Sequence, residues 1–305
     1  MEEKIRIENV TKKFGSYAAL DGISLSFEKG KIHGMIGRNG SGKTVLFKCI
    51  CGFLRVDDGA VFVDGKQIGK EIEAPESIGA IIETPGFLPG YSARQNLQFL
   101  AGIRRKIGKK EIDAAIRKVG LDPEAKKHVG KYSLGMRQRL GIAQAIMEEP
   151  SLLILDEPLD GLDPVMRKQI WTILMSEVAE RRTTVLVSSH NLRELEDVCD
   201  HVGIMNHGKV IIERSLFDLH GNISKIQVAC QTGMPKLPKE FEILHMSNSG
   251  RVYTMIVKGN PREVAAAIQT EGDHLAIVDI LPLTLEEIFI YEMGGLGYEV
   301  KDILF

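Results

Sequence analysis

The stretch Gly-Arg-Asn-Gly-Ser-Gly-Lys-Thr at 37–44 has the residue types and spacing of a phosphate-binding loop. Glycines let the backbone curl without Cβ clashes, so successive N–H groups can face one concavity suited to a phosphate. Lys43 is expected to bring its charge to the β- and γ-phosphates of a nucleotide, and the Thr44 hydroxyl to ligate Mg²⁺. The residues expected to hold the phosphates are Gly37, Arg38, Asn39, Gly40, Ser41, Gly42, Lys43 and Thr44.

The neighbours of this loop fit the same interpretation. Residues 31–36 predict a short strand entering the loop, and residues 45–50 predict a helix leaving it. The helix beginning near Ser41 would direct its positive end toward bound phosphate. The alternative is a chance glycine-rich turn, which the strand–loop–helix context disfavours.

Two acidic residues follow the continuous apolar run 152–155. Such a run is typical of a central parallel strand buried on both faces, which would deliver charge at its carboxyl end. Asp156 is expected to hold Mg²⁺, and Glu157 to orient or deprotonate an attacking water. Without the phosphate-binding loop, a strand running into an acidic turn would explain this stretch equally well.

The segment Tyr-Ser-Leu-Gly-Met-Arg-Gln-Arg at 132–139 resembles the signature motif of ABC-type ATPases, usually Leu-Ser-Gly-Gly-Gln. Ser133 and Gly135 agree with that motif, whereas Leu134 replaces a glycine and Met136 replaces a glutamine. A serine at a helix N-terminus is suited to an anion, although it would also serve as a plain helix cap.

Three further positions follow the family in the same order. Residues 159–163 resemble the family's D-loop, and Asp163 matches the end of that loop. His190 matches the histidine that contacts the γ-phosphate. Phe14 matches the aromatic residue that stacks on adenine, with Tyr17 as the second candidate. The resemblance comprises five ordered motifs over roughly residues 4–215. It implies ATP and Mg²⁺ as cofactors and hydrolysis of ATP, with Lys43 and His190 acting beside Glu157.

The resemblance also implies partners. In the family, two ATPase subunits enclose two ATP molecules, each phosphate-binding loop facing Ser133 and Gly135 of the other copy, so a homodimer is expected. The opening and closing of this dimer would drive a transmembrane permease subunit on a separate chain.

One position departs from the family. Where the family has the glutamine of its Q-loop, this sequence has Glu83, in Glu-Thr-Pro-Gly-Phe. A carboxylate can ligate Mg²⁺ but donates no hydrogen bond unless protonated, so Glu83 is expected both as a metal ligand and as a residue affecting turnover. This local form resembles bacterial exporters of peptide antibiotics such as bacitracin and lantibiotics.

Composition limits the other possibilities. The chain of 305 residues carries 39 basic and 41 acidic residues, a balance that does not favour a nucleic-acid-binding surface. The sequence has neither an apolar run long enough for a membrane span nor an apolar signal peptide. We therefore expect a cytoplasmic protein, and the resemblance implies that it is peripheral on the cytoplasmic face of the cell membrane. The cysteines, Cys49, Cys51, Cys199 and Cys230, are expected to be free thiols.

The pattern of elements predicts an α/β fold: a P-loop NTPase core with a mixed sheet, an antiparallel β subdomain, an inserted helical subdomain and a small C-terminal α+β appendage. We expect an ATPase domain over residues 1–219, with the helical subdomain at about 92–148, and an accessory domain over 220–305. Residues 190–198 are expected to be helical.

Two other functions were weighed. A soluble ABC ATPase acting on DNA, ribosomes or iron–sulfur assembly would usually carry a long coiled-coil or zinc-bearing insertion or a second ATPase domain, and this sequence has none. A non-hydrolysing nucleotide-binding module is disfavoured because Lys43, Asp156, Glu157 and His190 are all present.

Overall fold

A computed structural model of the chain describes residues 2–230, 241–271, 275–281 and 283–295. The chain forms two compact units, the first made of Met1–His190 and Val198–Glu213, the second of Asn191–Asp197 and Arg214–Phe305. The expected domain boundary after residue 219 stays a prediction. Within the described ranges, no helix combines the length and the apolar character needed to cross a membrane.

The first unit is built on a six-stranded sheet whose strand order is β10-β9-β3-β8-β7-β6. Its strands β9, β3, β8, β7 and β6 pair in parallel, so their carboxyl ends meet at one edge. Every residue of β3, β7 and β8 is buried, which explains the continuous apolar sequence of β7. The strands span Ile32–Ile36 (β3), Ile78–Ile81 (β6), Leu152–Leu155 (β7), Thr184–Ser189 (β8), His201–Asn206 (β9) and Lys209–Ser215 (β10).

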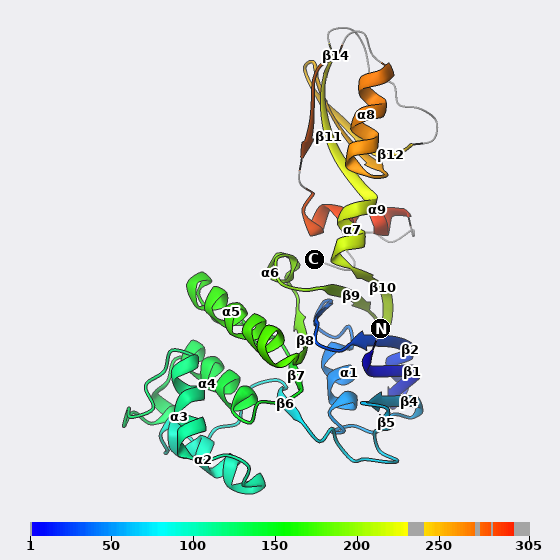
Figure 1. The fold of residues 1–305 in the computed structure, drawn as a ribbon. Helices are drawn as coiled ribbons and strands as arrows, with labels where there is room; N and C mark the ends of the chain where they lie inside the picture. Colours follow the sequence, from blue (N-terminus) through cyan, green and yellow to red (C-terminus); the bar gives the residue numbers. More distant parts are fainter. Residues whose placement is uncertain (1, 231–240, 272–274, 282, 296–305) are drawn as a thin grey trace. The chain divides into compact units, whose positions relative to one another are not determined.

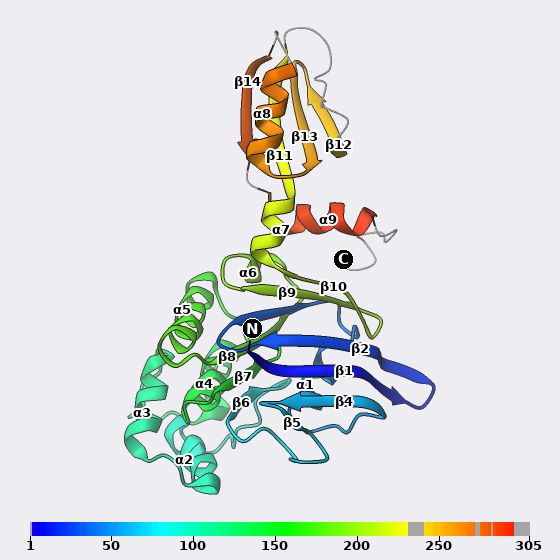
Figure 2. The same cartoon turned by 45° about the vertical axis from the view of Figure 1, so that its right-hand side comes forward.

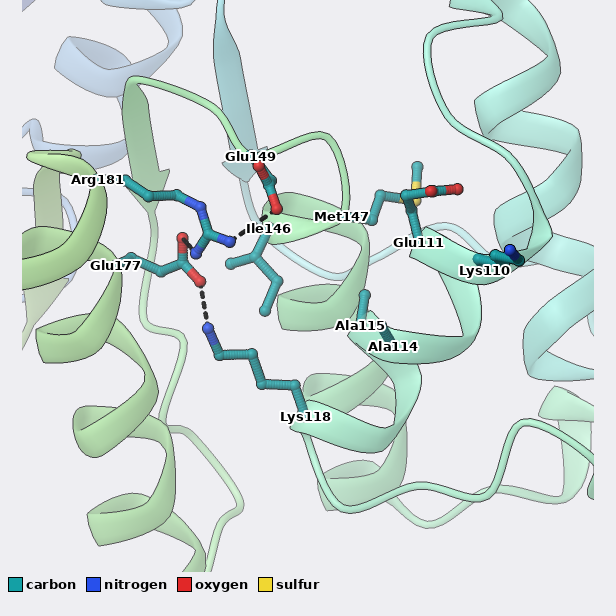
Figure 3. A pocket seen from close by; sticks show the side chains of 10 residues that line it. All are labelled: Lys110, Glu111, Ala114, Ala115, Lys118, Ile146, Met147, Glu149, Glu177 and Arg181. Atoms are coloured by element: carbon teal, nitrogen blue, oxygen red, sulfur yellow. Dashed lines mark hydrogen bonds and ion pairs between the residues drawn. The ribbon is translucent and has the colours of Figure 1, made fainter.

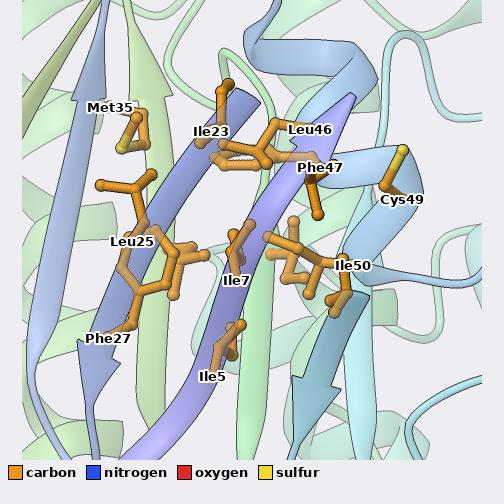
Figure 4. Packing of buried hydrophobic residues seen from close by; sticks show 14 of the residues in the cluster. Ile5, Ile7, Ile23, Leu25, Phe27, Met35, Leu46, Phe47, Cys49 and Ile50 are labelled. Atoms are coloured by element: carbon orange, nitrogen blue, oxygen red, sulfur yellow. The ribbon is translucent and has the colours of Figure 1, made fainter. Parts of the chain in front are cut away.

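A second, four-stranded sheet of the first unit has the order β2-β1-β4-β5 and antiparallel pairing. Helix α1 (Lys43–Ile50) packs its buried Leu46 and Phe47 into one core with Ile5 and Ile7 of this sheet (Figure 4). The helix that follows the phosphate-binding loop is therefore fixed between the two sheets. The strands span Glu3–Phe14 (β1), Tyr17–Glu28 (β2), Asp58–Val63 (β4) and Lys66–Gln67 (β5).

The helical subdomain expected at about 92–148 contains α2, α3 and α4, which pack on one another (Figure 1). Helix α2 begins with a capping box in which Ser92 accepts from the Gln95 N–H and Gln95 accepts from the Ser92 N–H. The helices span Ala93–Arg104 (α2), Lys109–Lys118 (α3), Leu134–Ile146 (α4) and, after β7, Pro164–Arg181 (α5).

An ion-pair cluster joins this helical subdomain to α5 (Figure 3). The Glu177 carboxylate is almost fully buried and lies between Lys118 of α3 and Arg181 of α5, whose Nη1 is 3.0 Å away. Arg181 also contacts Glu149, at 2.7 Å. Because a buried carboxylate left unpaired is costly, this cluster stabilises one arrangement of α3 against α5.

The second unit is a four-stranded sheet of order β12-β13-β11-β14, with α8 packed on it (Figure 2). Its core contains Ile226, Val228, Met255, Val257 and Val264. The elements span Arg193–Glu196 (α6), Leu216–Asn222 (α7), Ile223–Cys230 (β11), Glu242–Ser249 (β12), Val252–Lys258 (β13), Pro261–Glu271 (α8), Leu275–Leu281 (β14) and Leu285–Gly295 (α9). The fold class predicted from the sequence is confirmed.

The helix expected over residues 190–198 is wrong in extent. Only Arg193–Glu196 is helical, as α6. The side-chain oxygen of Asn191 accepts a hydrogen bond from the Arg193 N–H at 3.1 Å, which ends the preceding irregular segment and starts the helix late. The chain then enters β9 after Asp200, whose carboxylate accepts from the Ile32 N–H at 2.8 Å.

Three of the expected free thiols are confirmed: Cys49, Cys51 and Cys199 are buried and unpaired with one another. Burial raises the pKa of the Cys49 thiol to about 11 and that of Cys51 to about 12. The Cys230 side chain lies outside the described residues.

A buried histidine lies in the central sheet, toward the start of β3. His33 is stacked on His201 with ring centroids 5.1 Å apart, and its Nε2–H donates to the Glu28 carbonyl at 3.0 Å. Burial lowers the pKa of His33 from 6.5 to about 4, and the neighbouring His201 acts in the same direction, whereas the Glu28 carbonyl opposes them. His33 is therefore neutral in the folded protein at neutral pH.

The first unit should lose about 2 kcal/mol of unfolding free energy between about pH 7 and pH 5 through His33 alone. The cause is that unfolded His33 gains a proton below pH 6.5, whereas folded His33 gains one only near pH 4. The measurement is urea denaturation followed by the fluorescence of Trp171, the single tryptophan, which is buried in α5 of this unit. His33→Gln should show a weaker pH dependence, and the exposed-site control His128→Gln should behave like wild type. Equal slopes for His33→Gln and wild type would contradict this assignment.

Candidate functional site

The phosphate-binding loop connects β3 to α1 and has the close backbone approaches that its glycines permit. Gly40 and Gly42 have φ of 83° and 108°, in the left-handed region that favours glycine. A Cβ at Gly42 would lie 2.6 Å from the Ala19 carbonyl oxygen, and one at Gly37 would lie 2.4 Å from that of Met205. The hydroxyl of Ser41 is buried without a hydrogen-bond partner. Glycine at positions 37 and 42 is therefore required by space.

Lys43 and Thr44 begin α1 and lie at the carboxyl edge of the sheet. The Lys43 side chain is buried, and its Nζ donates to the Gly37 carbonyl within the loop. The Thr44 hydroxyl donates to the Asp156 carboxylate at 2.7 Å. The hydroxyl oxygen of Thr44 and the carboxylate oxygen of Asp156 are hard metal ligands placed next to one another, which fits Mg²⁺.

A hollow of about 200 Å³ lies over the loop. Its lining includes Phe14 and Tyr17 on one side and Glu157 on another. The Tyr17 hydroxyl donates to the Gly40 carbonyl at 3.1 Å, and both aromatic rings are about half exposed. The structure thus brings the predicted loop and both predicted aromatic residues together with the predicted base, and the adenine-stacking role of Phe14 stays a prediction.

Glu157 is held from three directions. Its backbone has φ of 46°, and its N–H donates to the Ser188 hydroxyl at 2.9 Å while its carbonyl accepts from Gln138 Nε2 at 3.2 Å. The Ser188 hydroxyl in turn donates to Asp156 at 2.6 Å. The Glu157 side chain lies 3.0 Å from His190 Nδ1 through Oε2, and Oε1 is 3.4 Å from Lys43 Nζ, an ion-pair distance without a hydrogen bond.

The sequence interpretation missed two of these residues. Gln138 lies on α4 and Ser188 on β8, and both are buried. Ser188 stands two residues before the predicted His190, in the Ser-Ser-His stretch that resembles the family's switch region, but only the histidine was given a role. Gln138 carried no signal that separates it from the other polar residues of its helix.

Glu157 and His190 also belong to a second grouping of possible ligands. One ligand atom each of Glu157, Asp160 and His190 lies within 4.8 Å of the others. His190 and Asp160 are exposed, and all three adjoin the site already described. This grouping therefore adds no separate metal centre to the pair formed by Thr44 and Asp156.

The remaining predicted residues lie around this centre in different ways. Glu83 has φ of 60° and its carboxylate is 2.6 Å from Lys48 Nζ, so its charge is paired within the subunit. Its role as a metal ligand or in turnover stays a prediction.

Ser133 and Asp163 are helix caps in the structure. Ser133 accepts from the Met136 N–H at 3.2 Å at the start of α4, and Asp163 accepts from the Val165 and Met166 N–H groups at 3.0 Å at the start of α5. Among the described residues, neither these two nor Gly135 lines the hollow over the loop. The sequence-based alternative for Ser133, a helix cap, is thus present, and its nucleotide-binding role stays a prediction.

Leu134, which replaces a glycine of the signature motif, packs on the D-loop. A Cβ added at Gly161 would lie 2.3 Å from Leu134 Cδ2 and 2.8 Å from its Cγ. Gly161 has φ of 73°. Gly161 therefore provides the space that the larger side chain at position 134 needs.

Comparisons with known proteins show what this chain is similar to. The model of the ABC transporter family matches residues 20–160. Bacitracin transport ATP-binding protein BcrA of Enterococcus faecalis is 43% identical over 72% of this chain and 72% of its own length. The protein of that name from Bacillus licheniformis is 35% identical over 97% of this chain and 99% of its own length.

Two solved structures of ATP-binding cassettes resemble much of this chain. The ADP-bound conformation of an ATP-binding cassette of an ABC transporter has a TM-score of 0.61 and 28% identity, covering 70% of this chain and 92% of that chain. A nucleotide-free cassette has the same TM-score with 27% identity, covering 70% of this chain and 91% of that one.

Replacing Gly161 with alanine should destabilise the first unit by about 2 kcal/mol, mainly from left-handed backbone strain, with a smaller part from displacing the half-exposed Leu134 side chain. Gly65→Ala is the matched control, because Gly65 has φ of 78° and open space around it, so it should cost only about 1 kcal/mol. The measurement is denaturation followed by Trp171 fluorescence.

The pair Leu134→Ala and Gly161→Ala completes a double-mutant cycle. Leu134→Ala removes both clashing atoms, so the double variant should be more stable than the sum of the single effects by about 0.5–1 kcal/mol. Additive effects would mean that Leu134 does not determine the residue at position 161.

Proposed function

This chain belongs to the ATP-binding proteins of ABC transporters, and from that premise we propose that it hydrolyses ATP to ADP and phosphate to power transport through a separate membrane subunit. The observation that carries this proposal is the convergence of Lys43, Asp156, Glu157 and His190 at the carboxyl edge of one sheet, next to a hollow lined by the phosphate-binding loop. A module that only binds nucleotide would not need this set of charged and proton-transferring groups.

Each of these residues has a role that its position supports. Lys43 and the loop N–H groups bind the phosphates, and Phe14 or Tyr17 offers a ring for the base. Thr44 and Asp156 would hold Mg²⁺, which when bound neutralises charge on the phosphates. Glu157 accepts the proton of the attacking water, and His190, at 3.0 Å, orients its carboxylate.

We further propose that two copies of the chain complete each nucleotide site. Among the described residues, the lining of the hollow in one subunit does not include that subunit's own Ser133, Gly135 or Asp163. Ser133 begins a 13-residue helix whose positive end suits a phosphate of the partner's nucleotide. The dimer thus gives a function to motif residues that a single copy leaves outside its hollow.

The membrane partner would bind the apolar surface of the helical subdomain. Phe99 and Ile103 of α2 are exposed, as are Leu88 and Tyr91 of the segment before it, and the rings of Tyr91 and Phe99 pack edge to face with centroids 5.0 Å apart. Exposed apolar side chains gathered in this way are typical of a binding surface. Such a partner would hold the protein at the cytoplasmic face of the membrane. Since two relatives are named for bacitracin transport, we propose export of an antimicrobial peptide as the transport reaction.

The test is steady-state ATP turnover and oligomeric state of Glu157→Gln beside wild type, with Mg-ATP. Loss of a general base typically costs 10²- to 10⁴-fold, so turnover should fall at least about 100-fold while ATP still binds. Trapped ATP should also favour a stable dimer, detectable by light scattering.

Glu149→Gln is the matched control for this test. Glu149 precedes the same strand β7 and has φ of 50°, but it pairs with Arg181 away from the hollow. It should turn over ATP like wild type. If Glu157→Gln did so as well, Glu157 would not be the base, and a wild type without turnover would remove the proposed function.

A further inference from the structure

The residue that follows His190 belongs to the other compact unit. The chain passes from the first unit to the second between His190 and Asn191, returns between Asp197 and Val198, and leaves again after Glu213. The short segment 191–197, which contains α6, therefore belongs to the second unit, where α6 contacts α9. Asn191, the first residue of this segment, is joined by a peptide bond to His190, whose side chain contacts Glu157.

Helix α6 is held at both ends by the start of α9. Arg193 donates to Glu286 Oε2 through Nη2 at 3.0 Å and Nε at 3.2 Å. Glu196 Oε1 accepts a hydrogen bond from the Leu285 N–H at 2.8 Å. A four-residue helix has no independent stability, so its conformation depends on these contacts.

Apolar packing supports the same attachment. Leu195 of α6 is fully buried, as are Leu285, Ile288 and Phe289 of α9, and the two helices are in contact. The adjacent Glu287 instead pairs with Lys225 of β11 at 2.6 Å. Within the second unit, α9 is thus held to strand β11 of the sheet as well as to α6.

We infer that Arg193, Glu196 and Glu286 are positioning residues for His190, through which the C-terminal unit controls ATP turnover. This inference rests on the proposed function, since it assigns His190 a part in hydrolysis. The α6–α9 contacts fix the backbone just after His190. They thereby favour the arrangement in which Nδ1 lies 3.0 Å from the Glu157 carboxylate.

The test uses the full chain with Glu196→Ala and Glu286→Ala combined. This removes both polar contacts between α6 and α9 without substituting any residue of the first unit. Turnover at saturating ATP should fall about tenfold, whereas KM for ATP should stay within about twofold, because the phosphate-binding loop is untouched. Lys225→Met is the matched control: it removes an ion pair to the neighbouring residue of α9 but none to α6, and it should behave like wild type.

A charge swap distinguishes positioning from damage to the second unit. Glu286→Arg alone should lower turnover, and Arg193→Glu added to it should restore at least half of the loss. The inference would be overturned by unchanged turnover in the double variant Glu196→Ala and Glu286→Ala, or by a charge swap that does not restore turnover. In either case the proposed function would still stand, provided that the wild type hydrolyses ATP and Glu157→Gln does not. A wild type that does not hydrolyse ATP would overturn both.

Discussion

The site depends on the left-handed backbone of Glu157. A residue with a Cβ is strained at φ of 46° by about 1 kcal/mol or more, so this conformation persists only where neighbours hold it. Here the Ser188 hydroxyl accepts from the Glu157 N–H, and Gln138 donates to its carbonyl. With the peptide groups fixed on both sides, the Glu157 carboxylate lies beside Lys43 and His190.

Parallel pairing in the central sheet supplies these neighbours. Leu155 of β7 pairs with Val187 of β8, so the residues that follow, Asp156 and Ser188, emerge side by side. Ile36 of β3 pairs with Ser189, which brings the phosphate-binding loop to the same edge. Functional residues separated by more than a hundred positions therefore meet because their strands end together. Burial of these strands on both faces keeps the register from slipping.

Much of this could be predicted from the sequence, because the relevant signals are local. Glycine spacing identified the loop, and an apolar run ending in two acids identified β7 with Asp156 and Glu157. The fold class followed from the alternation of strand and helix patterns. The residues that hold Glu157 could not be predicted in this way, since Gln138 acts through an amide–carbonyl contact that exists only once α4 has packed near β7.

Two other features were beyond local reasoning for the same cause. The pattern of residues 190–198 suits a helix, but the Asn191 side-chain oxygen accepts from the Arg193 N–H and only Arg193–Glu196 is helical. Leu134 stands where the signature motif usually has a glycine, which made the motif look weaker. It is matched by Gly161 some 27 positions later, a compensation visible only when both loops are in place. Sequence motifs of this site are therefore best judged in pairs.

The way in which Glu157 is held also determines how the site can respond. Its supports come from three places: Gln138 from the helical subdomain, Ser188 from the sheet, and His190 from the last residue before the chain enters the second unit. A single hydrogen bond is worth about 1 kcal/mol, which corresponds to roughly a fivefold change in population. A small movement of any support therefore changes how often the carboxylate is correctly placed, so parts of the chain far from the phosphate-binding loop can influence the proposed hydrolysis.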